Sequence, residues 1–351
     1  MATGRRFSVC IPNYNNGEFI ADTIRSVLAQ TCDDDIEIVV SDNASTDDSV
    51  EVVRSFAADG VRLVENPVNL GLSANFDRVV EASTGRHLLL LSADDLAHPT
   101  AFERYAAVLD DLGADADRSV LIAAYDVVDA AGGLVGAMHR APGTWVYEEL
   151  ALADAATADR STPVEVDDGL DVLAGALRRR LAPAPFVTTC FPRAAYDAVG
   201  GYRSGFRAWP DTHFALKLLS TGPSLVYVPE RLFSYRIHEH NQFRSFDRQR
   251  LLHYQVDSYL HTVEFPSDVL ERVGVERDQL VDAYALRAIL GRSRRAVAAG
   301  APTMALRYMA FGLATHPRAV LRRRETYALA TAALLGPVGR WYARRMPELA
   351  A

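Results

Sequence analysis

The chain has few cysteines and almost no lysine. Its 351 residues include three cysteines, Cys10, Cys32 and Cys190, and one lysine, Lys217. Three cysteines cannot form a disulfide framework, and no pair has the spacing of a zinc finger, so we expect a reduced, cytoplasmic protein. Because arginine supplies nearly all the positive charge, arginine richness alone is weak support for phosphate recognition in this chain.

Long hydrophobic segments are missing as well. No uninterrupted apolar stretch reaches the roughly 18 residues that indicate a membrane span, and residues 327–338, the nearest candidate, are too few to cross a bilayer. The apolar run at 7–11 is too short for a signal peptide and is typical of a first buried strand. We therefore expect a soluble protein or one that lies at the surface of a membrane.

Positive charge is scarce over most of the chain. The net charge is −8, from 37 basic and 45 acidic residues. Residues 285–351 contain 12 arginines and only Glu325 and Glu348, a net +10, which leaves −18 on the residues before them. Such an acidic body lacks the basic face of a general nucleic-acid-binding protein. The composition, 49% hydrophobic and 23% charged, is that of a globular protein, and the length predicts about two domains.

Short apolar segments alternate with helical patterns over the first 130 residues. The patterns predict strands at 7–11, 36–40, 61–64, 87–91 and 120–128, and helices at 18–30, 46–56, 73–82 and 99–112. This alternation is typical of βαβ units and of a parallel sheet that is covered on both faces. Ligands on such sheets bind beyond the carboxyl ends of the strands.

The rest of the chain is less regular at first and then strongly helical. After a hairpin turn at 131–133, the patterns predict helices at 168–181, 194–199 and 212–220, and strands at 186–191, 225–228 and 232–237. From residue 247 nearly every segment is helical, with breaks at Pro266, Gly274, 300–302, 316–317 and 336–337. We place a domain boundary near residue 245.

Polar residues gather where the first, second and fourth predicted strands end. These segments are Pro12-Asn13-Tyr14-Asn15, Ser41-Asp42-Asn43 and Ser92-Ala93-Asp94-Asp95. Since the carboxyl ends of parallel strands share one edge of the sheet, we expect a single ligand site there. Tyr14, flanked by amide side chains, suits a wall for a nucleobase.

Two carboxylate positions in these segments allow two interpretations each. The adjacent Asp94 and Asp95 repel each other, and a hard cation such as Mg²⁺ or Mn²⁺ would relieve the repulsion. They could instead cap the following helix. Asp42 could contact a base or sugar hydroxyls, or cap the helix that begins after Thr46.

These segments carry a resemblance to a known family. Residues 7–112 resemble the nucleotide-sugar-binding half of a family 2 glycosyltransferase with the GT-A fold, through Val9-Cys-Ile-Pro-Asn-Tyr-Asn15, Ile38-Val-Val-Ser-Asp-Asn-Ala-Ser-Thr-Asp47, Asn66-Pro-Val-Asn-Leu-Gly71 and Leu91-Ser-Ala-Asp-Asp95. The resemblance continues to about residue 245 through Val199-Gly-Gly-Tyr202, Trp209-Pro-Asp-Thr212 and Tyr235-Arg-Ile-His238. It implies an α/β fold with a GT-A-type, Rossmann-like mixed sheet flanked by helices, followed by a C-terminal helical region.

The resemblance also implies roles for individual residues. Those expected to contact the nucleotide sugar are Pro12, Asn13, Tyr14, Asp42, Asn69, Asn75, Ser92, Ala93 and Asp94. Asp94 would ligate Mg²⁺ or Mn²⁺, assisted by Asp95 and with His238 approaching from the far side, although His238 could also be structural. Asp211 would be the general base, and Trp209 beside it could form a platform for the acceptor sugar.

The chain departs from the family pattern at two positions. Ser92 stands where the family often has the first Asp of an Asp-x-Asp motif, which weakens binding of the ribose by a carboxylate. Pro210 replaces the usual Glu before the base, which could change the orientation of Asp211.

The implied activity is transfer of a sugar from a nucleotide-diphospho sugar to an acceptor hydroxyl or amine, with inversion at the anomeric carbon. A sugar nucleotidyltransferase is an alternative, but it usually needs a basic glycine-rich loop after the first strand, where this chain has Pro12-Asn-Tyr-Asn15. A non-catalytic nucleotide-sugar-binding protein is another.

The division of the chain follows from these features. We expect a GT-A domain over 1–245, with a nucleotide-sugar-binding half at 1–130 and an acceptor-side half at 131–245, and a basic helical region at 246–351. Arginines and aromatic residues in the last helices could contact an anionic membrane. They could equally dock on the acidic body of the same chain or on a second copy in a homodimer.

Overall fold

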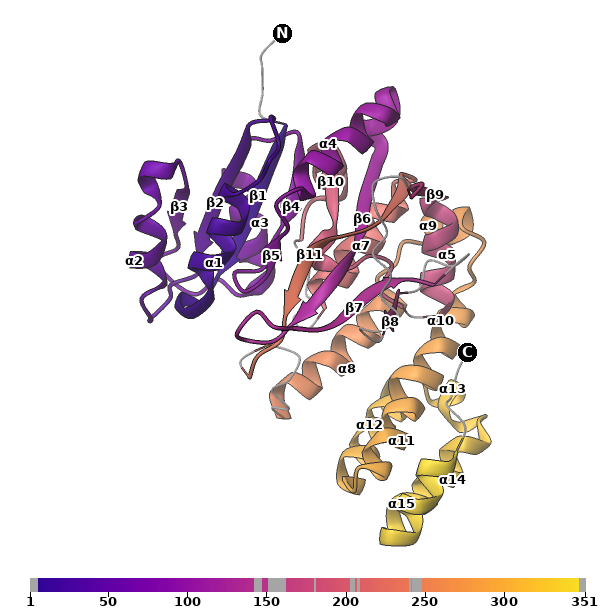
Figure 1. The fold of residues 1–351 in the computed structure, drawn as a ribbon. Helices are drawn as coiled ribbons and strands as arrows, with labels where there is room; N and C mark the ends of the chain where they lie inside the picture. The colour runs from indigo at the N-terminus through magenta and orange to yellow at the C-terminus, as the bar shows by residue number, and fades with distance from the viewer. Residues whose placement is uncertain are drawn as a thin grey trace. The chain divides into compact units, whose positions relative to one another are not determined.

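The computed structural model describes residues 6–141, 147–150, 162–179, 181–202, 206, 209–239, 241 and 248–346. The chain divides into two compact units (Figure 1). The first unit takes residues 1–172, 182–205 and 210–245, and the second takes 173–181, 206–209 and 246–351. The boundary predicted near residue 245 lies outside the described residues, and the predicted division at 130 and 245 stays a proposal.

The first part of the chain alternates strands and helices, as predicted. Its elements are β1 (Phe7–Asn13), α1 (Gly17–Leu28), β2 (Ile36–Asp42), α2 (Ser49–Arg54), β3 (Arg62–Glu65), α3 (Leu72–Ala82), β4 (His87–Leu90), β5 (Leu96–Ala97), α4 (Ala101–Leu112) and β6 (Ser119–Val128). Short 3-10 turns follow α2 (Ala57–Asp59) and α4 (Gly113–Arg118). The two-residue strand β5 was not predicted, because two residues carry no periodic signal.

The remaining elements up to residue 236 complete the sheet. They are β7 (Leu134–Arg140), β8 (Tyr147–Leu150), β9 (Glu165–Asp168), α5 (Gly169–Arg179), β10 (Cys190–Pro192), α6 (Arg193–Val199), α7 (Pro210–Ser220) and β11 (Ser224–Arg236). The hairpin predicted at 131–133 joins β6 to β7.

Two predictions in this part are wrong in detail. The strand predicted at 186–191 begins only at Cys190, because Phe186–Thr188 forms a 3-10 turn that is closed by a bond from Thr189 Oγ1 to Pro185 O. The strands predicted at 225–228 and 232–237 are the single strand β11, which is interrupted only by irregular pairing with β6 between Val228 and Phe233. The irregular pairing is a bulge within one strand and not a turn between two strands.

The sheet is mixed, as predicted. Eleven strands of the described residues form it, and eight of them follow the order β3-β2-β1-β4-β10-β6-β11-β5. Of the other three, β7 pairs with β6 and β8, and β9 pairs with β11. Strands β3, β2, β1 and β4 run parallel, while β10 lies antiparallel between β4 and β6. Figure 1 shows helices on both faces of this sheet.

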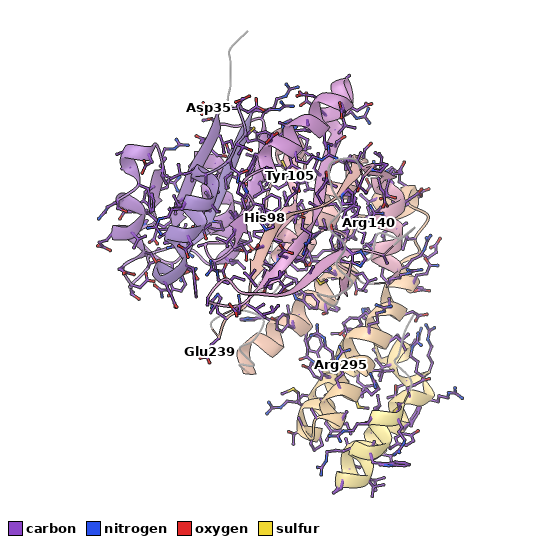
Figure 2. All side chains as sticks on the ribbon, viewed as in Figure 1. Asp35, His98, Tyr105, Arg140, Glu239 and Arg295 are labelled. Atoms are coloured by element: carbon purple, nitrogen blue, oxygen red, sulfur yellow. The ribbon has the colours of Figure 1, made fainter. Side chains whose placement is uncertain are left out.

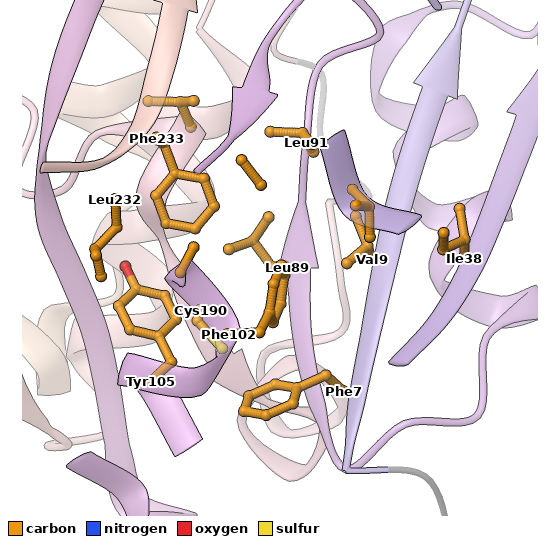
Figure 3. Close-up of a cluster of buried hydrophobic side chains, with 14 of the residues drawn as sticks. Phe7, Val9, Ile38, Leu89, Leu91, Phe102, Tyr105, Cys190, Leu232 and Phe233 are labelled. Carbon is orange, nitrogen blue, oxygen red and sulfur yellow. The ribbon is translucent and has the colours of Figure 1, made fainter. Parts of the chain in front are cut away.

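A buried apolar core fixes the sheet of the first unit. Phe7, Leu89, Phe102 and Phe233 are fully buried and come from β1, β4, α4 and β11, as Figure 3 shows. Burial of each such side chain contributes about 1.5–3 kcal/mol to the free energy of unfolding. Cys190 in the same core is unpaired and fully buried.

The second unit is helical, as predicted from residue 247 onward. Its helices are α8 (Arg248–Val263), α9 (Ser267–Arg272), α10 (Arg277–Ala283), a π-helical segment (Tyr284–Gly291), α11 (Arg292–Ala298), α12 (Pro302–Thr315), α13 (Pro317–Leu321), α14 (Arg324–Leu334) and α15 (Gly336–Arg345). The breaks fall at the predicted Pro and Gly positions, and one more falls at Arg322 and Arg323. None of the helices in the described part of the chain has the length and apolar character of a membrane span.

The Gly200-Gly201 pair that ends α6 has a structural requirement for glycine. Both residues have positive φ angles, 72° and 69°. A Cβ at Gly201 would stand 2.5 Å from Asp77 Oδ1, which accepts hydrogen bonds from the Tyr196 hydroxyl and from Tyr202 N. A side chain at position 201 would therefore break the contact between α3 and the segment that follows α6.

We predict that Gly201→Ala lowers the free energy of unfolding by about 2–4 kcal/mol, because it combines left-handed backbone strain with a clash on a buried carboxylate. Gly132→Ala is the matched control, since Gly132 has a φ of 85° and open space around its Cβ position. It should cost only about 1–2 kcal/mol. Urea unfolding of both variants checks this, and equal losses would contradict the role given to the Asp77 contact.

Candidate functional site

The polar ends of three strands meet at one edge of the sheet, as predicted. In the parallel pairing of β1 with β2, Asn13 lies opposite Asp42. On the other side of β1, Cys10 pairs with Leu90, and the next residue, Leu91, donates its N–H to Cys10 O. The segment that contains Ser92 and Asp94 therefore starts beside the segment that contains Asn13.

The loops after β1 and β2 are joined by hydrogen bonds. Asn13 Nδ2 donates to Asp42 Oδ1 at 2.8 Å, and Ser45 donates to both oxygens of Asp42 from its hydroxyl and its backbone N–H. Asn15 N–H donates to Ser45 Oγ at 2.9 Å. Ala44 adopts a left-handed conformation (φ 60°), which is strained for a residue with a Cβ and persists because these bonds hold the loop.

Asp42 is accordingly 2% exposed and fully engaged within the protein. It does not cap α2, which was the alternative interpretation. Asp47 instead accepts the N–H and hydroxyl of Ser49 at the start of that helix, and its other oxygen accepts Gly17 N–H. The arrangement indicates that Asp42 shapes the loop edge, and its predicted contact with the nucleotide stays a prediction.

A buried amide network underlies the same edge. Asn75 of α3 is 2% exposed, and its Oδ1 accepts bonds from Ser41 Oγ (2.8 Å) and Asn66 Nδ2 (2.9 Å). Its Nδ2 donates to Ser41 O and Asn13 O. Asn75 thus joins three strand ends from below, and its predicted place near the nucleotide sugar stays a prediction.

The exposed rim of the edge carries the groups that a ligand could reach. Tyr14 is 46% exposed, and Asn69 is exposed while its Oδ1 accepts bonds from Asn43 Nδ2 and Gly71 N. The Oδ1 of Asn13 is buried and has no hydrogen-bond partner within the described part of the chain. A buried acceptor without a partner is costly, so a donor group of a ligand would stabilise it. Pro12, the residue before it, is half-buried within β1.

Asp94 forms hydrogen bonds with residues that end or follow β11. His238 Nε2 lies 2.9 Å from Asp94 Oδ2, and Asn241 Nδ2 donates to the same oxygen at 3.3 Å. Asn241 also donates to Arg236 O and accepts the backbone N–H of His238. Figure 2 labels Glu239, which lies between these two residues in the chain. Both bonds to the carboxylate fall on Oδ2.

Arg236 completes this attachment. Its Nε donates to Asp94 O at 2.9 Å, and its backbone N–H donates to Asp95 Oδ1 at 2.9 Å. Its guanidinium stands 5.0 Å over the ring of Phe19, and Phe19 also packs against the His238 ring at 4.5 Å. The sequence placed Arg236 in a family motif but suggested no role for it, since its partners are about 140 residues away.

Asp95 differs from its neighbour. It is 1% exposed, and burial, followed by the nearby charge of Asp94, raises its pKa well above the usual value. One of its oxygens already accepts the Arg236 N–H. These contacts give Asp95 a role in holding β11 to the loop, and its predicted assistance to Asp94 in metal binding stays a prediction.

The implied Mg²⁺ or Mn²⁺ can be tested against these donors. No group of three or more His, Cys, Asp or Glu side chains forms a ready metal cage among the described residues. Asp94 is 16% exposed, and its Oδ1 has no hydrogen-bond partner in the described ranges, so it offers one hard oxygen. Mg²⁺ is commonly held by one or two carboxylates together with substrate phosphates, and this donor set fits that pattern. Ser92 is half-buried and Ala93 is 1% exposed beside it.

Asp211 lies in the first turn of α7, directly after Pro210. Proline suits the first turn of a helix because the missing N–H would have no helical partner there. Asp211 is half-buried and lines a pocket with Leu90, Ala184, Phe186, Thr189, Phe191, Tyr202, Phe214, Ala215 and Leu218. Burial, followed by the charge of Asp211, raises the pKa of Tyr202. Since Leu90 ends β4, the pocket brings Asp211 to the strand that leads to Asp94.

Trp209 belongs to the second unit. Its backbone N–H donates to Asp257 Oδ2 at 2.9 Å, its ring packs on Tyr254, and the Arg292 guanidinium lies 5.0 Å over it. The ring therefore has a packing role in the structure, and its predicted role as an acceptor platform stays a prediction.

Comparisons with known proteins decide the family of the first part of the chain. The model of glycosyl transferase family 2 matches residues 8–130. The matched residues, about a third of this chain, form a family 2 glycosyltransferase domain. The predicted membership is thereby confirmed for the domain that contains Asn13, Asp42 and Asp94.

Curated relatives match about a third of this chain. The uncharacterized glycosyltransferase YibD of Escherichia coli is 34% identical over 116 residues, which are 32% of this chain and 33% of YibD. The uncharacterized glycosyltransferase alr2836 of Nostoc is 37% identical over 106 residues, 29% of this chain and 32% of the relative. The matched part is thus about a third of the length of these relatives.

Solved structures resemble the chain over a longer range. The structure of S. aureus TarS 1-349 in complex with UDP has a TM-score of 0.58 and 14% identity, and the match covers 93% of this chain and 90% of that one. The complex with UDP-GlcNAc has a TM-score of 0.55 and 14% identity, with 93% and 91% covered. This likeness confirms the GT-A-type fold with its C-terminal helical region.

We predict that Asn75→Ala lowers the free energy of unfolding by about 2–4 kcal/mol, because it removes the short bonds of the buried Ser41 and Asn66 side chains and leaves Asn66 Nδ2 only longer contacts, 3.4 Å to Ser41 Oγ and 3.5 Å to Asn43 Oδ1. Asn69→Ala is the matched control at an exposed amide of the same edge and should cost about 1 kcal/mol or less. Urea unfolding followed by circular dichroism measures both. Similar losses in the two variants would contradict the structural role of the buried network.

Proposed function

We propose that this chain is an inverting glycosyltransferase that moves a sugar from a nucleotide-diphospho sugar to an acceptor hydroxyl or amine. The observation that carries the proposal is the sheet edge of the family 2 domain, where the exposed Tyr14 and the unpartnered Asn13 Oδ1 lie at one end and Asp94 follows the neighbouring strand. TarS is described with UDP and UDP-GlcNAc, so UDP-sugars are the first donors to test.

The nucleotide would lie along this edge. The Tyr14 ring offers a stacking face for the base, and Asn13 Oδ1 offers an acceptor for a base N–H. Asp42 and Ser45 keep Asn13 in place, and Asn75 keeps the strand ends together beneath it. The diphosphate would then lie toward Ser92 and Asp94.

Asp94 would hold the divalent cation, and His238 and Asn241 would fix the carboxylate through Oδ2 while Oδ1 stays available. When bound, Mg²⁺ or Mn²⁺ supplies positive charge that neutralises the leaving diphosphate. Asp95 would act indirectly, by fixing Arg236 and with it the loop that carries Asp94.

Asp211 is proposed as the general base. Its place in the first turn of α7 favours a negative charge, since the helix N-terminus carries partial positive charge. The acceptor oxygen or nitrogen would form a bond to the anomeric carbon while the bond from that carbon to the diphosphate oxygen breaks. The acceptor proton would pass to Asp211. Attack opposite the leaving group inverts the anomeric configuration.

Two finer expectations complete the proposal. The transferase is proposed to act in the cytoplasm, which agrees with its three unpaired cysteines. Its C-terminal helices are proposed to contact either a membrane surface or a second copy of the chain.

We predict that Asp211→Asn lowers the transfer rate at least a hundredfold while binding of the nucleotide sugar, measured by thermal shift, stays within about twofold of the unmodified protein. The amide keeps the shape of the side chain but cannot accept the acceptor proton. Asp197→Asn, at an exposed carboxylate of α6, is the control and should leave the rate unchanged. A transfer rate for Asp211→Asn equal to that of the control would remove Asp211 as the base.

We predict that chelation of divalent cations abolishes transfer and that added Mn²⁺ or Mg²⁺ restores it, because the leaving diphosphate needs charge neutralisation. Asp94→Ala should weaken this response, so that about tenfold or more metal is needed for half-maximal rate. Full activity in the presence of a chelator would contradict the metal assignment, while donor binding without any transfer or hydrolysis would favour a binding protein.

A further inference from the structure

The last described helix, α15, packs through its smallest residues. Gly339 and Ala343 are its buried positions, and a Cβ on Gly339 would stand 1.8 Å from Ala332 O of α14. Arg344 Nε donates to Ala298 O of α11 at 3.2 Å, and Arg294 of α11 donates to Ala343 O at 3.5 Å. Close backbone contact and arginine bonds therefore fix α15 on α11 and α14, without any of its large apolar side chains.

Those large side chains face outward instead. Val338, Trp341 and Tyr342 are 65%, 58% and 45% exposed, and their spacing of three and four residues places them on one face of α15. Leu334 and Leu335, at the end of α14, are 78% and 52% exposed. We name these five residues the apolar patch. An ordinary surface helix buries such residues and exposes small ones, so the patch marks a candidate interaction surface.

Positive charge accompanies the apolar patch. Arg345 lies on the same face, seven residues after Val338, and its guanidinium stands 4.1 Å over the Trp341 ring. Residues 317–346 contain seven arginines against one acid, Glu325, for a net +6. Asp282, from the preceding helix α10, pairs with Arg322 and Arg323, while Arg340 is exposed.

We propose that the apolar patch docks α14 and α15 on a bilayer surface that contains anionic phospholipids. Trp and Tyr favour the boundary between headgroups and acyl chains, and Leu and Val favour the acyl side. Arginines beside them gain electrostatic attraction from anionic headgroups. The helix lies in the plane of the membrane, and none of the described helices needs to cross it.

The charge distribution favours a lipid surface over a symmetric dimer. A two-fold dimer through the apolar patch would place the same surface against itself and would bring the Arg345 side chains of both copies to the same interface. Like charges at close range oppose such a contact. An anionic membrane satisfies the apolar and the cationic parts of this surface at once.

The proposal is tested by sedimentation of the full chain with vesicles of phosphatidylcholine alone and with about a third phosphatidylglycerol. We expect binding to the anionic vesicles in 50 mM salt, at least tenfold weaker binding to neutral vesicles, and a loss of about fivefold or more in 500 mM salt. Trp341→Ser combined with Tyr342→Ser, and separately Arg340→Glu combined with Arg345→Glu, should each lower binding at least tenfold.

Matched controls use equally exposed residues of the first unit. Val166→Ser, at a residue that is 56% exposed, and Arg118→Glu, at an exposed arginine, should leave binding unchanged. Circular dichroism and thermal unfolding show that every variant is folded, and both substituted pairs face solvent. Donor binding and transfer by the patch variants in solution should be unchanged, which separates this proposal from the proposed activity.

Three outcomes would overturn the proposal. One is absence of binding to anionic vesicles in 50 mM salt. The second is binding that the apolar and arginine variants retain in full. The third is self-association of the chain without vesicles that the same variants abolish, which would assign the apolar patch to a second copy.

Discussion

The parallel pairing of β1 with β2 on one side and with β4 on the other is the constraint on which the candidate site depends. Parallel strands end at a common edge, so this pairing gathers three polar segments that are far apart in the sequence. The bond of Asn13 to Asp42, and the bonds of Asn75 Nδ2 to both Asn13 O and Ser41 O, fit this register. A shift by one residue would break them and turn each buried strand residue to the opposite face.

A second set of hydrogen bonds fixes the position of Asp94. Arg236, His238 and Asn241 bond to it across more than 140 residues of chain. Bringing together two segments so far apart in the chain costs conformational entropy. The buried side chains of Leu232 and Phe233, in the same strand as Arg236, offset that cost. The placement of the proposed metal ligand therefore depends on how β11 packs in the core.

The last helix of the chain packs in a different way. In α15, glycine and alanine make the close contacts, while the aromatic and aliphatic residues remain exposed beside arginines. A hydrophobicity pattern alone favours the opposite orientation, because large apolar residues normally face the core. Close approach of two helix backbones leaves no room for a large side chain on the packed face, and this reverses the usual arrangement.

The sequence by itself determined the alternation of elements, the helical breaks and the polar strand ends, because periodicity, Gly and Pro act locally. Its motifs were also sufficient to identify the family. Only the tertiary structure decided which of the predicted residues are exposed at the edge: Tyr14 is exposed, whereas Asp42, Asn75 and Asp95 are buried and hold the edge together. It also decided that Phe186–Thr188 is a turn and that α15 packs through Gly339. The physical reason is the same in each case, since burial and hydrogen-bond partners come from residues distant in the chain, which no local pattern records.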